Sequence, residues 1–218
     1  MRAFTSPFDL GWWSFDLGDL RPCDGTYELY DFAGVPDLAD SALAGDYEWL
    51  RESAGEASPC NGDLLEDIRV ALEAAGLTLP PAFEVFMGDA ALQDAVPSCT
   101  GCEWDLGDVA VPCPIEPGAF TVRFLRDQQD CLFWYLYLAP GQAPQVVCSP
   151  IHFDAPEGEL TADVLRRNTV AAAPEFEAFV HRWWLENELW EIVNDDLDEE
   201  DLSPEQAAYL RFYRERTH

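Results

Sequence analysis

The hydrophobic positions follow a clear helical period from residue 61 onward. Leu65, Ile68 and Leu72 recur at three- and four-residue spacing, and Gly76 supplies the left-handed residue that commonly ends a helix. A shorter helix is predicted to begin at residues 79–81, Leu-Pro-Pro, because proline is well tolerated in a first helical turn. The sequence therefore predicts two consecutive helices ahead of the central part of the chain.

The central part of the chain changes to the two-residue period of β-strands. Apolar and more polar side chains alternate over residues 120–125, and residues 127–130 have the composition of a turn. No polar face interrupts residues 131–138, which predicts a central strand covered on both faces. One side would carry Leu132, Trp134, Leu136 and Leu138, and the other Phe133, Tyr135 and Tyr137. A further strand is predicted at residues 146–148.

The C-terminal third of the chain is predicted to be helical. Pro174 opens a long apolar-rich helix that continues through Val193, and Ser203-Pro204-Glu205-Gln206 has the form of a capping box that starts a final helix. Helices, then antiparallel strands, then helices indicate an α+β fold. We expect a mostly antiparallel sheet flanked by helices, with a helical C-terminus.

Residues 1–60 show no sustained period. Short apolar groups such as residues 11–15 are interrupted by Gly, Pro and Asp, which predicts irregular structure with one helix over residues 37–51. We expect residues 1–60 to form an N-terminal extension packed on the core, and residues 61–218 to form the main α+β domain. The length is typical of one or two domains, and we expect the two parts to make one compact unit.

The segment from Ile68 to Phe86 resembles the opening signature of the SUKH superfamily, the relatives of yeast cell-wall assembly regulators of the Smi/Knr type. In that family a helix with an Ile and a following Glu leads through a Gly to Leu-Pro, and then to two aromatic residues three positions apart. The matching residues here are Ile68, Leu72, Glu73, Gly76, Leu79, Pro80, Phe83 and Phe86. The strands and acidic turn at residues 120–138, followed by a Phe-x-x-Phe helix at residues 176–179, are similar to the family's order of elements.

The resemblance covers residues 62–193 and implies a SUKH-like fold with a binding role. Many bacterial members resemble immunity proteins that neutralise a cognate toxin, and no common catalytic residue set comes with the fold. Two features depart from the family pattern: Met-Gly-Asp-Ala at residues 87–90 replaces a frequent Asn-Gly run, and the hairpin turn lacks glycine. Residues 1–60 have no counterpart in the family.

The chain is strongly acidic: its 218 residues carry 42 Asp and Glu, 12 Arg and no Lys, for a formal net charge of −30. The lack of lysine excludes pyridoxal Schiff bases, Walker-type phosphate loops and Ser–Lys hydrolases. Scattered arginines and a negative net charge are unsuited to a phosphate backbone, so we expect no nucleic-acid partner. The charge favours a basic protein partner. Alternatively, the acidity is a background property, as in halophile proteins.

The densest run of acidic side chains is the candidate partner-binding segment. It lies between the two C-terminal helices and comprises Asp195, Asp196, Asp198, Glu199, Glu200 and Asp201. The run lacks the central glycine and the closing glutamate of an EF-hand calcium loop. A solvated acidic linker is the alternative interpretation of the same residues.

Cys99, Cys102 and Cys113 are the candidate metal ligands. Structural zinc sites usually combine two short-spaced ligand pairs, and this chain has a single Cys-x-x-Cys pair. Buried free cysteines, packed as small hydrophobic residues, are the alternative. His181 follows Glu177 by one helical turn, which favours an ion pair or a satisfied surface position over metal ligation.

A nucleophile–base pair of Cys148 and His152 is the remaining catalytic candidate, and no local motif marks it. No Gly-x-Ser-x-Gly motif and no phosphate-binding glycine loop occurs in the sequence. We therefore expect a non-enzymatic protein without a cofactor.

The longest apolar run, residues 131–140, is about half as long as a membrane span requires. The N-terminal residues contain no apolar stretch of secretory length. Seven cysteines are an odd number for a disulfide framework. We expect a cytoplasmic protein without a membrane partner.

The leading functional hypothesis is a non-enzymatic protein-binding module, in particular an immunity protein that neutralises a basic toxin domain. One alternative is a structural or regulatory interaction protein whose acidity is background. Another is a metal-binding enzyme that uses the cysteines as ligands.

Overall fold

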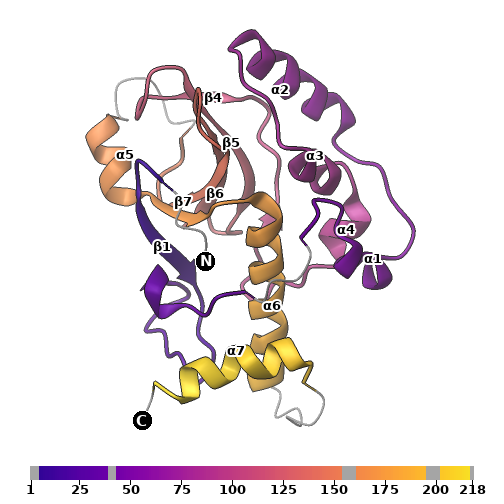
Figure 1. Ribbon diagram of the computed structural model, residues 1–218, viewed down its shortest axis with the longest axis vertical. Helices are drawn as coiled ribbons and strands as arrows, with labels where there is room; N and C mark the ends of the chain where they lie inside the picture. The colour runs from indigo at the N-terminus through magenta and orange to yellow at the C-terminus, as the bar shows by residue number, and fades with distance from the viewer. Residues whose placement is uncertain (1–4, 39–42, 154–160, 195–201, 217–218) are drawn as a thin grey trace.

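The computed structural model describes residues 5–38, 43–153, 161–194 and 202–216. These residues form seven α-helices and one eight-stranded mixed sheet, which confirms the predicted α+β fold with a helical C-terminus (Figure 1). Among the described residues, no helix combines the length and the apolar character needed to cross a membrane. The helices are α1 (Glu48–Ala54), α2 (Gly62–Ala74), α3 (Pro81–Met87), α4 (Ala90–Asp94), α5 (Ala162–Asn168), α6 (Phe176–Asn194) and α7 (Pro204–Arg214).

The sheet has the strand order β2-β1-β8-β7-β6-β5-β3, and β4 also pairs with β5. Its pairings are antiparallel except that β1 runs parallel to β8. The mostly antiparallel sheet that the sequence predicts is therefore confirmed. The strands are β1 (Asp9–Ser14), β2 (Glu28–Asp31), β3 (Glu103–Trp104), β4 (Val111–Cys113), β5 (Ala119–Arg126), β6 (Phe133–Leu138), β7 (Gln145–Ser149) and β8 (Val170–Ala173).

Two hydrophobic clusters pack on the two faces of the sheet, and β6 contributes to both. In Figure 1, α5 lies on the opposite side of the sheet from α2, α3 and α6. The larger cluster, on the side of these three helices, includes Trp134, Leu136 and Leu138. The smaller cluster, beside α5, includes Phe133, Tyr135 and Tyr137. Every residue of β6 is buried, so the predicted central strand with two covered faces is confirmed.

The N-terminal segment contributes two strands to the sheet, where the sequence predicted irregular structure. β1 lies between β2 and β8, and Trp12 is fully buried against Phe179 and Trp183 of α6. The prediction was wrong for these strands because the buried positions of β1 do not coincide with its hydrophobic residues. Leu10 is 40% exposed, whereas Ser14 is fully buried.

The helix predicted over residues 37–51 is wrong at its start, since α1 begins at Glu48. Gly45 and Tyr47 have φ angles of 84° and 59°, in the left-handed region that interrupts a helix. The buried carboxylate of Glu177 in α6 accepts hydrogen bonds from the backbone N–H groups of Gly45 and Tyr47, at 2.5 and 3.1 Å. A tertiary contact thus overrides the local helical pattern.

A buried ionic network joins β1, α6 and α7. Glu186 of α6 is fully buried, and its two carboxylate oxygens accept hydrogen bonds from the two terminal nitrogens of Arg21 at 2.6 and 2.8 Å. Trp12 Nε1, Ser14 Oγ and the Tyr209 hydroxyl donate to the same carboxylate at 2.9, 2.5 and 2.5 Å. Burial alone would raise the pKa of Glu186, but Arg21 and the hydrogen bonds lower it from 4.5 to about 2.

We expect Glu186→Gln to lower the free energy of unfolding by about 3–5 kcal/mol, because the charge of Arg21 stays buried without its counter-ion. Urea denaturation of the wild type and the variant measures the difference. Glu66→Gln is the matched control, since it removes a carboxylate that pairs with Arg69 on the surface, and it should leave the urea midpoint almost unchanged. Equal midpoints for Glu186→Gln and the wild type would contradict the prediction.

The same network makes stability depend on pH in the acid range. Because the folded-state pKa of Glu186 is lowered, its stabilisation is fully present above pH 4.5 and is lost as the pH falls toward about 2. The difference in unfolding free energy between the wild type and Glu186→Gln should therefore shrink across this interval. Urea denaturation at a series of pH values tests this, and a difference that does not change with pH would overturn it.

Candidate functional site

Two adjoining cavities form a groove at one end of the sheet, where β6 ends, β7 begins and β8 ends. The first, of about 480 Å³, lies between the N-terminal residues 5–7 and the loop at residues 141–145. The second, of about 530 Å³, lies between the starts of α3 and α6, beside residues 43–45. We name the two together the end groove, because both are lined by Ala143, Pro144 and Pro174.

Five prolines fix the walls of the end groove: Pro7, Pro80, Pro81, Pro144 and Pro174. The proline ring restricts φ, so each of these backbone positions has little freedom. Pro80 and Pro81 form the N-terminus of α3, as the sequence predicted. A groove with rigid walls loses little conformational entropy when a ligand binds.

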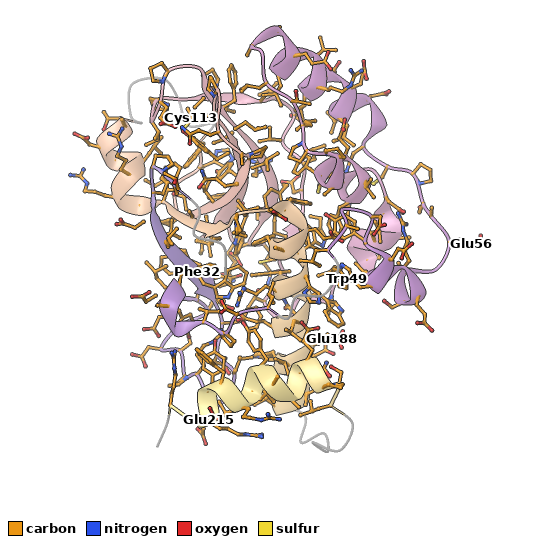
Figure 2. All side chains as sticks on the ribbon, in the orientation of Figure 1. Phe32, Trp49, Glu56, Cys113, Glu188 and Glu215 are labelled. Atoms are coloured by element: carbon orange, nitrogen blue, oxygen red, sulfur yellow. The ribbon has the colours of Figure 1, made fainter. Side chains whose placement is uncertain are left out.

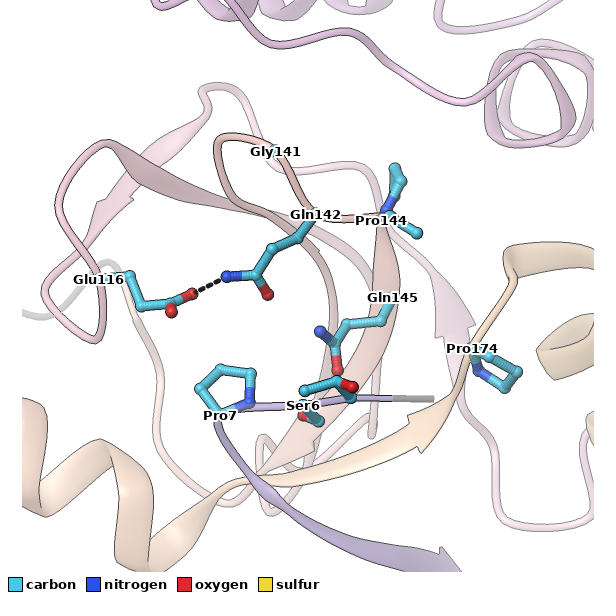
Figure 3. Close-up of a pocket in the computed structure, with 10 residues that line it drawn as sticks. Ser6, Pro7, Glu116, Gly141, Gln142, Pro144, Gln145 and Pro174 are labelled. Atoms are coloured by element: carbon cyan, nitrogen blue, oxygen red, sulfur yellow. Dashed lines mark hydrogen bonds between the residues drawn. The ribbon is translucent and has the colours of Figure 1, made fainter. Parts of the chain in front are cut away.

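The polar groups of the first cavity come from separate segments of the chain (Figure 3). Glu116 precedes β5, and its Oε2 accepts hydrogen bonds from the Tyr137 hydroxyl and from Gln142 Nε2, both at 2.7 Å. Burial, followed by the hydrogen bond to Glu116, raises the pKa of Tyr137, so its hydroxyl stays protonated. Gln145 is 2% exposed, and its Oε1 has no hydrogen-bond partner.

The second cavity is less polar than the first. Pro80, Pro81 and Phe176 line it, and Phe176 is itself held in the core by edge contacts with other aromatic rings. Glu175 is exposed at this cavity. Glu177 is buried and bonded to backbone N–H groups, so its role is structural. Glu175 is therefore the carboxylate of this cavity that a ligand can reach.

The end groove is electronegative. Its lining within the described residues includes Glu116, Glu175 and Glu177 and no Arg, Lys or His. Elsewhere in the described part of the chain, most arginines are neutralised by internal contacts. Arg21 and Arg182 are buried in the core, and carboxylates pair with Arg51, Arg69, Arg123 and Arg126.

The predicted partner-binding residues lie outside the part of the chain that the structure describes. They are Asp195, Asp196, Asp198, Glu199, Glu200 and Asp201. Their flanks are described: α6 ends at Asn194, and the capping box of Ser203 and Gln206 that starts α7 is confirmed. A partner-binding role for the acidic run stays a prediction.

The three candidate metal ligands pack against different parts of the core. Cys99 and Cys102 contact the larger hydrophobic cluster, whereas Cys113 is buried in the smaller one, at the end of the sheet near β4 (Figure 2). No set of three His, Cys, Asp or Glu side chains within the described residues is grouped to hold a metal ion. Burial raises the pKa of the Cys99 and Cys102 thiols, which makes them weak nucleophiles at neutral pH.

Cys148 and His152 do not form a nucleophile–base pair. Cys148 is fully buried in the larger cluster. The ring of His152 packs instead against Phe133 of the smaller cluster, and its Nε2 lies 2.6 Å from a terminal nitrogen of Arg123. The two residues therefore face opposite sides of the sheet.

His181 pairs with a different carboxylate from the one predicted. It is buried between Trp49 and Trp184, and its Nε2 lies 3.4 Å from Oε2 of Glu205 in α7. Of the two predicted alternatives, the surface position is wrong because His181 is buried, and the carboxylate of Glu177 is bonded instead to backbone N–H groups before α1.

A further cleft, of about 570 Å³, carries charges of both signs. Arg123 and Arg126 both pair with Asp105, at 3.0 and 2.9 Å, and Arg126 also pairs with Glu103 at 2.5 Å. Because its arginines are neutralised by neighbouring carboxylates, this cleft offers no net positive site for an anion.

No sequence pattern marks Glu116, Gln142 or Gln145 as functional residues. Glu116 is distant in the sequence from Gln142 and Gln145, and only the folded chain brings it to them. The one local signal is the concentration of prolines in the loops that carry Glu116 and Gln142, namely Pro114, Pro117, Pro140 and Pro144. Prolines at such density indicate rigid loops, without indicating their chemistry.

No protein-family model, no curated protein and no solved structure matches this chain. The resemblance to the SUKH superfamily therefore stays a prediction, which rests on the residues from Ile68 to Phe86 and on the order of the elements.

Proposed function

We propose that this chain is a non-enzymatic protein-binding module that holds a basic segment of a protein partner in the end groove. The observation that carries the proposal is the lining of the groove. Glu116 and Glu175 line it, five prolines fix its walls, and no cationic side chain is found in its lining among the described residues. A preformed cavity with one sign of charge is suited to a ligand of the opposite charge.

The charge of the whole chain supports the same role. A net charge of −30 attracts a basic partner over a distance and speeds association, an effect that salt weakens. The buried Arg21 and Arg182 reduce this field little at the surface, because they are bonded within the core.

The resemblance to SUKH proteins supports a more specific form of the proposal, an immunity protein that neutralises a basic toxin domain. Neutralisation requires rapid and tight association and no chemistry by the inhibitor. All seven cysteines are free thiols, which supports a cytoplasmic location where thiols stay reduced.

Selection of a random peptide display library on the immobilised full-length protein should enrich peptides with Arg or Lys beside an apolar residue. The carboxylates of the groove attract the cation, and the second cavity accommodates the apolar side chain. The association rate of an enriched peptide, measured by surface plasmon resonance, should fall about tenfold between low and high salt.

Two double variants with the same change of charge test the location of binding. Glu116→Gln/Glu175→Gln alters the groove, whereas Glu52→Gln/Glu56→Gln alters exposed residues at and after the end of α1 that line neither cavity (Figure 2). Binding should weaken in the first variant only. Equal weakening in both would show that the overall charge, and not the end groove, governs binding. Unchanged binding in both would favour the alternative of an interaction protein whose acidity is background.

The immunity form of the proposal predicts a rescue. Coexpression of this chain with a toxic basic protein encoded beside its gene should restore growth, and growth curves measure the effect. The Glu116→Gln/Glu175→Gln variant should protect less than the wild type, and Glu52→Gln/Glu56→Gln should protect equally well. Full protection by the groove variant would contradict a role of the end groove in neutralisation.

A further inference from the structure

The first cavity of the end groove contains a buried amide that lacks the hydrogen bonds it needs. Gln145 is 2% exposed, and its Oε1 has no partner. Buried polar atoms are almost always hydrogen-bonded, since a buried acceptor without a donor destabilises the folded state. Figure 3 shows Gln145 among the residues that line the cavity, with its terminal amide on the side of Ser6. Such an acceptor at the wall of a cavity indicates a ligand that brings a donor.

Glu116 provides a second acceptor on another wall of the same cavity. Its Oε2 receives both hydrogen bonds donated by the protein, from Tyr137 and Gln142. These two donors hold the carboxylate in one orientation, while its Oε1 accepts no hydrogen bond from a described residue. The cavity therefore presents a charged acceptor that is already oriented and a neutral acceptor that is already buried.

The chemistry of these two acceptors favours a guanidinium group. Arginine has five N–H donors in one rigid plane, so a single side chain can donate to two acceptors on different walls and carry the charge that Glu116 requires. Lysine presents its donors from one nitrogen and is less suited to two separated acceptors. A neutral donor would bring no positive charge to the carboxylate of Glu116.

We propose that the first cavity is an arginine subsite, in which the guanidinium of a partner's arginine donates to Glu116 and to Gln145. This inference rests on the proposed function and names the side chain that the groove selects. Rotation about the last side-chain torsion of Gln145 exchanges its two amide atoms, so Oε1 can turn toward the guanidinium. The residue next to the arginine then passes over Pro144 and Pro174 into the second cavity.

The probes for the test are the amides of N-acetyl-arginine, N-acetyl-lysine and N-acetyl-citrulline, the last of which keeps the shape of arginine without its charge. Each is titrated into the full-length protein and followed by two-dimensional amide NMR. We expect arginine amide to shift the side-chain amide resonances of Gln142 and Gln145 and to bind about tenfold more tightly than citrulline amide. Lysine amide should fall between the two.

Two variants and one control separate the roles of the acceptors. Gln145→Met keeps the length of the side chain, removes the amide and should abolish the preference for arginine over lysine. Because it removes a buried acceptor without a partner, its thermal stability should equal or exceed that of the wild type. Glu116→Gln should weaken the binding of both cations, whereas the equally charged control Glu56→Gln should bind them like the wild type.

The outcomes distinguish this inference from the proposed function. Equal binding of arginine and citrulline amides, shifts away from Gln142 and Gln145, or an unchanged preference in Gln145→Met would overturn the arginine subsite. If basic peptides still bind the groove in that case, the proposed function stands without the subsite. If neither the amides nor the basic peptides bind, both proposals fail.

Discussion

The ion pair between Arg21 and Glu186 is the interaction on which the arrangement of this chain depends. β1 is registered with β8 at two positions only, so strand pairing alone attaches the N-terminal segment weakly. Glu186 supplies the missing attachment, because Trp12 and Ser14 of β1, Arg21 of the following loop and Tyr209 of α7 all donate to its carboxylate. A fully buried carboxylate requires this many donors to stay ionised. One side chain of α6 therefore fixes three segments that are distant in the sequence.

The position of β1 in turn shapes the end groove. Residues 5–7 lead directly into β1 and form one wall of the first cavity. The placement of the arginines also affects the charge of the surface, because Arg21 and Arg182 bond carboxylate and hydroxyl groups inside the core. Four carboxylates of the described residues, those of Asp89, Asp127, Glu177 and Glu186, are buried as well as these two arginines, so burial leaves most of the net negative charge on the outer surface. Arginine is thus used to form the buried ion pair, whereas the described lining of the end groove contains no cationic side chain.

Sequence patterns predicted the elements whose signals are local and missed those that depend on distant contacts. The period of Leu65, Ile68 and Leu72 predicted α2, and the unbroken apolar run predicted β6, because both elements bury the residues that are hydrophobic. β1 was missed because its buried Ser14 is satisfied by a carboxylate on α6, which no local pattern can indicate. The candidate site was missed for the same reason, since Glu116 gains its orientation only where the folded chain brings Tyr137 to it.

The register of β6 and β7 explains why Glu116 and Gln145, the two acceptors of the first cavity, line the same cavity. Tyr137 of β6 and Gln145 of β7 are paired across the sheet, and paired residues of antiparallel strands project from the same face. Tyr137 belongs to the smaller hydrophobic cluster, and its hydroxyl reaches Glu116 beyond the edge of that cluster. The register that packs the aromatic face of β6 therefore also sets where Gln145 and Glu116 stand. Gln145 is held by a strand, and Glu116 is held in its loop by the hydroxyl of a strand residue, so a ligand has to reorient only the side-chain amide of Gln145.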